Sequence, residues 1–203
     1  MLFIVGPHNA GKTTLASFLG RHGFLHIETG DIVRQAYQQE MPAMDFNEWA
    51  SVRNRALDDL IIQAVPEVIE RALNSDGPCR GIVISGNRQL TGVQRLKEAF
   101  PPPEDQGHLI VYLDAREEVL FERQLHRPGR QYPEMDFENF CHKYLGFDIS
   151  MGLLGLKKAA DLVVCTDKGL ECFDKVLRFL QENGYEAPSR FEGQSWGGPE
   201  RQE

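Results

Sequence analysis

The chain has 203 residues, of which 41% are hydrophobic and 26% are charged, a composition typical of a folded globular domain and unlike that of disordered or fibrous proteins. Its formal net charge of −8 provides no general positive field, so nucleic acid and anionic membranes are not expected partners. No apolar run approaches the roughly 18 residues of a membrane-spanning helix, and no basic signal-peptide region precedes the first apolar residues. The four cysteines form no CxxC pair, so a cytoplasmic protein without a zinc cage or disulfide framework is predicted.

Short apolar runs predict five strands, each followed by a helical pattern. The strands are expected at residues 2–5, 24–28, 81–86, 108–115 and 161–166. The helices are expected from about Lys12 onward and over residues 30–40, 91–99, 116–127 and 169–183. This alternation predicts an α/β fold, a five-stranded parallel sheet sandwiched by helices. In such sheets, ligands bind beyond the carboxyl ends of the strands.

Three further segments complete the expected organisation. An acceptor-side insertion is expected over residues 35–75, with a long helix near 46–75. Its apolar residues at core-like spacing are Trp49, Leu57, Leu60, Ile61, Val65, Val68, Ile69 and Leu73. The prolines of residues 100–107 predict a surface loop. Residues 184–203 mix Gly, Pro and charge without a period, so a disordered tail is predicted after a single domain of residues 1–183.

Residues 6–14, GPHNAGKTT, match the pattern of a phosphate-binding P-loop and meet its context, because they follow a strand and open a helix. Glycines let backbone N–H groups turn toward phosphate oxygens, and the helix N-terminus adds positive charge. Lys12 is expected to reach the terminal phosphates, and the Thr13 hydroxyl to ligate Mg²⁺. The predicted cofactors are therefore ATP and Mg²⁺. The predicted loop residues are Gly6, Pro7, His8, Asn9, Ala10, Gly11, Lys12, Thr13 and Thr14.

A second signal is IETGDIVRQAY at residues 27–37, where a strand ends and a helix begins. Taken alone, Thr29 and Asp31 also fit an ordinary helix start with a cap and an acid in the first turn. The carboxyl ends of parallel strands share one edge of a sheet, however, so this helix start is expected beside the P-loop. Arg34, one turn into the helix, then suits a phosphate clamp.

A P-loop followed by Thr29-Gly30-Asp31-x-x-Arg34 resembles the nucleoside monophosphate kinases, the adenylate kinase-like branch of the P-loop NTPase fold. The resemblance implies that Arg34 holds the phosphate of an acceptor and that Thr29 lies near its base. ISGNRQL, residues 84–90, is similar to the family's Asp-Gly-x-x-Arg but one residue shorter. The implied acceptor-binding residues are Thr29, Gly30, Asp31, Arg34, Gly86 and Arg88.

Ser85 stands where the family has an acid that supports the metal. Mg²⁺ is therefore expected on Thr13 with Asp31 or Asp114, or on Thr13 and the nucleotide alone.

Residues 111–130 are similar to the strand and helix that lead into the family's lid, expected here over about residues 126–150. The resemblance implies that Arg123 lies near the donor adenine and Arg127 near the transferring phosphates, with Arg130 following. The Pro-Gly turn between Arg127 and Arg130 predicts a loop that is mobile when empty. Residues 163–173 resemble the loop around the donor base, with Lys168 and Gly169 in it, and fit an ordinary strand–helix connection equally well.

The implied activity is transfer of the ATP γ-phosphoryl group to a small phosphorylated acceptor, with a (deoxy)nucleoside monophosphate favoured. The implied catalytic residues are Lys12, Arg88, Arg127 and Arg130. Residues 145–164 and the SGxR motif also resemble small dephospho-CoA kinase-related P-loop proteins, which leaves the acceptor open. A hydroxyl kinase with Asp31 as base, a kinase for a nucleic-acid end or modified base, and a non-catalytic nucleotide-binding protein are the alternatives. A monomer or homodimer is expected.

Overall fold

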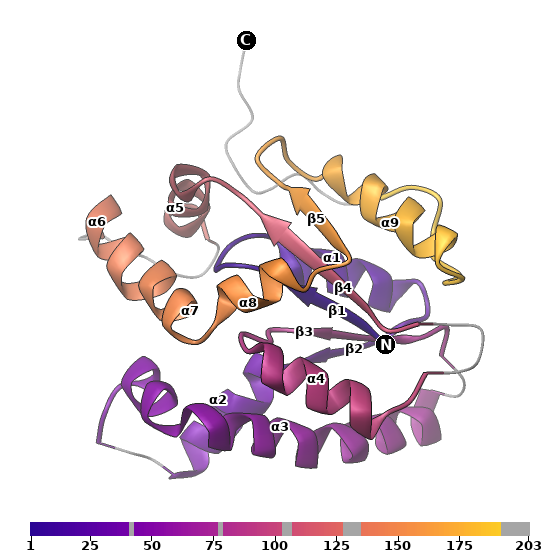
Figure 1. The fold of residues 1–203 in the computed structure, drawn as a ribbon, viewed down its shortest axis with the longest axis horizontal. Helices are drawn as coiled ribbons and strands as arrows, with labels where there is room; N and C mark the ends of the chain where they lie inside the picture. The colour runs from indigo at the N-terminus through magenta and orange to yellow at the C-terminus, as the bar shows by residue number, and fades with distance from the viewer. Residues whose placement is uncertain (41–42, 77–78, 103–106, 128–134, 192–203) are drawn as a thin grey trace.

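The structure is a computed structural model that describes residues 1–40, 43–76, 79–102, 107–127 and 135–191. In these residues, five strands form an all-parallel sheet with the order β2-β3-β1-β4-β5 (Figure 1). The strands are β1 (Leu2–Val5), β2 (Leu25–Glu28), β3 (Ile82–Ser85), β4 (Leu109–Asp114) and β5 (Leu162–Cys165). Each lies within a predicted range, so the α/β fold expected from the sequence is confirmed.

Helices connect the strands and cover both faces of the sheet (Figure 1). They are α1 (Lys12–Arg21), α2 (Thr29–Glu40), α3 (Phe46–Asp76), α4 (Leu90–Ala99), α5 (Glu117–Leu125), α6 (Phe137–Phe140), α7 (Gly146–Ser150), α8 (Leu153–Lys158) and α9 (Cys172–Glu182), with a π-helical turn, η1 (Cys141–Leu145), between α6 and α7. No helix in the described ranges is long and apolar enough to span a membrane.

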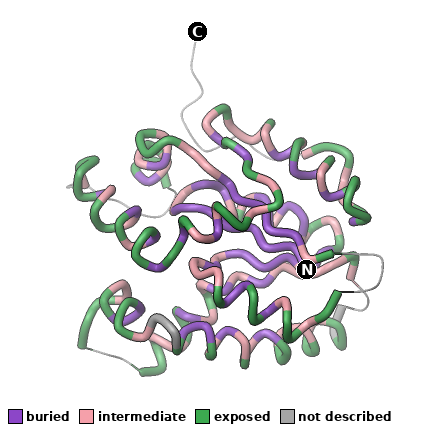
Figure 2. The backbone as a smooth tube through the Cα atoms, viewed as in Figure 1, coloured by how far each residue is buried: buried purple, intermediate pink, exposed green. Residues whose placement is uncertain are grey.

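The central strand β1 divides the core in two. Its four side chains are fully buried, and they point alternately to opposite faces of the sheet. Leu2 and Ile4 pack in one apolar cluster with α1 and α9, whereas Phe3 and Val5 pack in a second cluster with α3, α4 and α8. Figure 2 shows the buried strands in the middle and exposed helix faces on both sides. This burial holds the carboxyl ends of the strands at one rigid edge.

The insertion helix α3 follows the predicted apolar pattern over most of its length. Trp49, Leu57, Ile61 and Val65 are buried in the cluster that contains α4. Leu73, by contrast, is 43% exposed, so its assignment to the core was wrong. Leu73 lies in the last turn of the helix, and side-chain spacing alone does not indicate where the partner surface ends.

The segment that precedes β5 is more helical than the sequence indicated. Residues 137–158 form α6, η1, α7 and α8, for which no separate helices were predicted. Residues 128–134, in the first part of the predicted lid and including Arg130, lie outside the described residues.

The predicted tail is wrong over its first residues, because residues 184–191 pack on the domain. Tyr185 is buried, and its hydroxyl donates to the carbonyl oxygen of Gly107 at 2.8 Å. The ring of Phe191 lies 4.5 Å from that of Phe18 and 4.9 Å from that of Phe173, centre to centre. These two aromatic side chains provide enough buried apolar surface to order a segment otherwise rich in polar residues and proline. Residues 192–203 lie outside the described residues.

Candidate functional site

The P-loop connects the carboxyl end of β1 to the N-terminus of α1, and its backbone requires glycine. Gly6 and Gly11 have φ angles of 145° and 94°, which L side chains rarely adopt. A Cβ atom on Gly6 would lie 2.2 Å from the carbonyl oxygen of Leu113 in β4, so any side chain would collide with the sheet. Asn9 also has a positive φ of 62° and is held by its side-chain amide, which donates to Gln124 of α5 at 2.8 Å.

Lys12 lies folded back on the P-loop. Its Nζ donates to the carbonyl oxygen of Pro7 at 2.7 Å. Desolvation, reinforced by the positive charge of Arg88, lowers the pKa of Lys12 to about 7, and the carboxylate of Glu28 opposes this shift. The empty site therefore favours the neutral amine more than water does, and a bound anion shifts the balance back toward the ammonium form.

Affinity for a triphosphate should consequently fall as the pH rises above 7. Phosphate charge beside Lys12 favours the protonated amine, so a ligand that meets a neutral lysine must bind together with a proton. With a pKa of about 7 in the empty site, the apparent affinity should decrease by up to about tenfold for each pH unit above 7. Calorimetric titration with a non-hydrolysable ATP analogue at pH 7, 8 and 9 measures both the affinity and the proton uptake. Lys12→Arg, which stays charged, should lose the pH dependence, and a constant wild-type affinity would contradict the prediction.

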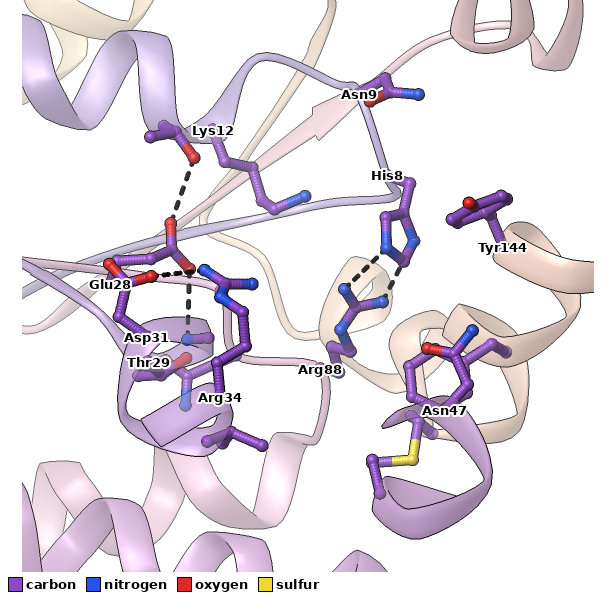
Figure 3. Close-up of a pocket in the computed structure, with 18 of the residues that line it drawn as sticks. His8, Asn9, Lys12, Glu28, Thr29, Asp31, Arg34, Asn47, Arg88 and Tyr144 are labelled. Carbon is purple, nitrogen blue, oxygen red and sulfur yellow. Dashed lines mark hydrogen bonds and ion pairs between the residues drawn. The ribbon is translucent and has the colours of Figure 1, made fainter. Parts of the chain in front are cut away.

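Glu28, at the end of β2, is a site residue that the sequence analysis missed. Its Oε2 accepts hydrogen bonds from the hydroxyls of Thr13 at 3.1 Å and Ser85 at 2.8 Å. A Cβ atom on Gly86 would lie 2.0 Å from its Oε1, so the glycine after β3 leaves room for this carboxylate. Figure 3 shows Glu28 below Lys12 and beside Thr29, the first residue of α2. The signal that could have revealed it is its position, because it ends a strand beside β3 at the same sheet edge.

The acids proposed from the sequence to support the metal have other partners than Thr13. Asp31 is 72% exposed and forms an ion pair with Arg34, with 2.5 Å between Oδ1 and Nη2. Asp114 accepts a hydrogen bond from Lys157 of α8 at 2.7 Å. The structure therefore places Glu28, and neither of these aspartates, in contact with the Thr13 hydroxyl.

The predicted acceptor residues and the P-loop line the same cavity, which has a volume of about 1560 Å³. Those at its wall are Thr29, Gly30, Asp31, Arg34, Gly86 and Arg88. The Thr29 hydroxyl donates to the carbonyl oxygen of Ser85 at 3.0 Å and so fixes the start of α2 to β3. The Arg34 side chain is half exposed. The structure thus brings together residues that are more than 70 positions apart in the sequence.

Arg88 is held in a buried polar cluster. It forms an ion pair with Asp148 of α7, whose side chain is 1% exposed. Its Nη1 and Nη2 lie 3.2 Å and 3.1 Å from the Nδ1 and Nε2 atoms of the His8 ring. Figure 3 shows His8 between Arg88 and Tyr144. The sequence analysis assigned His8 to the P-loop and Arg88 to the acceptor site, but it did not identify Asp148.

On the donor side, Arg123 connects the P-loop to the loop after β5. Its Nη1 donates to the carbonyl oxygen of Asn9 at 3.2 Å and to the hydroxyl of Thr166 at 3.0 Å. Gly169 lines the cavity, whereas Lys168 is exposed and is not among the lining residues. Arg127 lies at the cavity wall just after α5.

Comparisons with known proteins identify the family and the fold of the chain. The family model described as AAA domain matches residues 5–140. Adenylate kinase 1 of Nostoc sp. is 33% identical over 132 residues, which are 64% of this chain and 70% of that protein. A UPF0200 protein of Thermococcus sibiricus is 25% identical over 189 residues, which are 90% of this chain and 94% of that protein.

Among solved structures, a shikimate kinase from Bacteroides thetaiotaomicron matches with a TM-score of 0.52 and 14% sequence identity, covering 89% of this chain and 96% of that chain. At this identity the likeness shows the fold alone, and the P-loop NTPase fold expected from the sequence is confirmed. The chain belongs to the AAA-domain family of P-loop proteins, and within it to the kinase-type branch that includes the adenylate kinases.

Proposed function

We propose that this kinase transfers the γ-phosphoryl group of ATP to a small phosphorylated acceptor, a (deoxy)nucleoside monophosphate. The observation that carries the proposal is the arrangement of charge in the cavity. The P-loop lysine lines the cavity together with Arg34, in helix α2 after β2, and Arg88, three residues after β3. In this proposal the triphosphate on the P-loop pairs with the charge of Lys12, and the phosphate group of the acceptor pairs with the charges of the two arginines.

The apolar part of the cavity wall suits a base and a sugar. Apolar side chains from α2, α3, α7 and the turn after α7 line it, namely Val33, Tyr37, Phe46, Ala50, Leu57, Ile61, Phe147 and Met151. A flat ring buried against such a wall contributes apolar contact area, while its phosphate remains near the arginines. Adenylate kinase relatives are consistent with this acceptor class.

Phosphoryl transfer asks the protein for alignment and for positive charge around the transferring group. In this proposal Lys12, Arg88 and Arg127 supply the charge, while Arg34 and Arg88 align the acceptor phosphate with the γ-phosphoryl group. An acceptor phosphate is already ionised, so no strong general base is needed. Arg130 is the further arginine proposed from the sequence for the lid.

Thr13 and Glu28 fit Mg²⁺, because both present oxygen donors and their oxygens lie within 3.1 Å of each other. We propose that these two residues hold the metal and that Glu28 takes the role of the strand-end acid that Ser85 replaces. When bound, Mg²⁺ neutralises charge on the ATP phosphates. The Ser85 hydroxyl donates to Glu28 and so orients the carboxylate toward Thr13.

A panel of acceptors tests the assignment directly. The protein is incubated with labelled ATP and one candidate acceptor at a time. The acceptors are the common nucleoside and deoxynucleoside monophosphates, dephospho-CoA and short oligonucleotides. Turnover is expected with the monophosphates alone. Turnover with dephospho-CoA would establish a hydroxyl acceptor and overturn the proposal. The absence of transfer to every acceptor would favour a non-catalytic nucleotide-binding protein.

Arg34→Ala should raise the KM for the acceptor about 10- to 150-fold and leave the KM for ATP nearly unchanged. This range corresponds to about 1.5–3 kcal/mol for a hydrogen bond to a charged group. Steady-state kinetics with each substrate varied in turn measures the two constants. Arg95→Ala is the matched control, because Arg95 pairs with exposed Asp59 on the surface and does not line the cavity. An equal rise in both KM values would place Arg34 outside the acceptor site.

A further inference from the structure

Asp148 is a buried carboxylate that contacts both the P-loop and the arginine of the acceptor site. Its Oδ2 accepts the backbone N–H of His8 at 2.7 Å and lies 2.9 Å from Nδ1 of the His8 ring. The same carboxylate forms the ion pair with Arg88. Asp148 of α7 thus contacts both His8, the third residue of the P-loop, and Arg88, which lies three residues after β3.

Burial, together with the charges of its neighbours, sets the protonation of the His8 ring. Desolvation and the positive charges of Arg88 and Lys12 hold the pKa of His8 well below its usual value, so the ring is neutral. A carboxylate can only accept a hydrogen bond and a guanidinium can only donate one. Nδ1 lies 2.9 Å from Oδ2 of Asp148 and 3.2 Å from Nη1 of Arg88, so the shorter contact favours a proton on Nδ1 that faces Asp148. Nε2 then accepts from Nη2 of Arg88 at 3.1 Å, and the contact between Nη1 and Nδ1 is not a hydrogen bond. The three side chains form a closed network in which each is held by the other two.

Two aromatic neighbours of Asp148 support the same network. Tyr144, in the π-helical turn η1, packs edge-on against the His8 ring, with 5.1 Å between ring centres. The guanidinium of Arg88 lies 5.1 Å from the ring centre of Phe147, within the range of a cation–π contact. Residues at positions i, i+3 and i+4 share one helix face, so η1 and α7 present these side chains together. π-helical turns of this kind occur often at functional sites.

We propose that Asp148 is a positioning residue for phosphoryl transfer, which holds Arg88 and the P-loop in one rigid unit while the arginine faces the phosphates. This inference rests on the proposed function and deepens it. Arginine loses considerable rotamer entropy when it is fixed, and in this site the charges of Lys12 and Arg34 also repel it. The contacts to Asp148 and Nε2 use two of the five N–H donors of the guanidinium. In this proposal the remaining donors bind phosphate oxygens, since Arg88 lines the cavity.

Asp148→Asn keeps the size of the side chain and removes the charge that holds Arg88. The kcat should fall about 10- to 100-fold, the loss expected for a misplacement of about 1 Å, while the Kd for an ATP analogue changes less than about twofold. His8→Asn, which retains the backbone N–H to Asp148 but removes the ring, should give the same selective loss. Both substitutions act through Arg88. A double variant that combines either of them with Arg88→Lys should therefore have nearly the same kcat as Arg88→Lys alone. Asp59→Asn, at an exposed ion pair, is the control.

A second measurement does not depend on activity, and its first part needs the wild-type protein alone. Nitrogen-15 NMR of the wild-type protein should show His8 neutral and protonated at Nδ1, and Asp148→Asn should abolish this preference. A folded Asp148→Asn variant with wild-type kcat, or a wild-type ring protonated at Nε2, overturns the proposal. If the wild-type protein transfers no phosphoryl group to any acceptor, the proposed function fails, and the NMR result still decides whether the network exists.

Discussion

Lys12→Ala should abolish phosphoryl transfer while leaving the fold intact. Lys12 is the P-loop cation closest to the expected terminal phosphates, and its charge is needed most when negative charge shifts toward the leaving oxygen. Removal of one such preorganised group typically costs about 10²–10³-fold in kcat. The fold should tolerate the change because the site lowers the pKa of Lys12, which means that the charged lysine is held there at a cost to stability.

The prediction is checked by single-turnover kinetics together with thermal unfolding of the same preparation. Lys158→Ala is a suitable control, since Lys158 is exposed at the end of α8 and does not line the cavity. The melting temperature of Lys12→Ala should be equal to or above that of the wild type. Normal turnover in a folded Lys12→Ala variant would falsify the assignment of the P-loop as the donor site.

Glu28→Gln should weaken the dependence of nucleotide binding on divalent metal and lower kcat. Glutamine has nearly the same size as glutamate and can still accept from the Thr13 and Ser85 hydroxyls, so the substitution chiefly removes the charge that a hard cation prefers. The apparent affinity for Mn²⁺ in the presence of ADP, measured by electron paramagnetic resonance, should fall about 10- to 100-fold. Steady-state assays should require a correspondingly higher Mg²⁺ concentration.

Asp31→Asn is the informative comparison, because the sequence analysis assigned the metal to Asp31 and the structure places that side chain in an exposed pair with Arg34. It should leave the metal affinity within about twofold of the wild type, the scale of a surface ion pair. Gly86→Ala, whose Cβ would displace Oε1 of Glu28, should reproduce the Glu28→Gln defect without any change of charge. A larger loss from Asp31→Asn than from Glu28→Gln would restore the original assignment.

The strands and the P-loop could be predicted from the sequence because their signals are local. Buried parallel strands are continuous apolar runs, so the range predicted for β1 coincides with the observed strand and the other four strands lie inside theirs. The glycines of the P-loop follow from backbone conformation and from the closeness of β4 to Gly6. Arg34 and Arg88 could be assigned to this edge of the sheet because both follow strands. The carboxyl ends of parallel strands lie at the same edge, whatever the order of the strands.

Other features depend on contacts between distant segments, and only the tertiary structure decided them. Glu28 and Thr13 are 15 residues apart, and His8 and Asp148 are 140 apart, so no local pattern indicates that either carboxylate meets the P-loop. Ser85 in place of an acid appeared to be a gap in the metal site, because the neighbouring strand that supplies Glu28 is known only once the order β2-β3-β1 is known. The ordering of Tyr185 and Phe191 has the same cause, since an aromatic side chain in a polar segment gains stability only when a distant apolar surface accepts it. Local sequence thus determined the strands, the P-loop and the helices that follow the strands, whereas the helices over residues 137–158 and the burial of charged and aromatic groups were decided by which elements the fold places side by side.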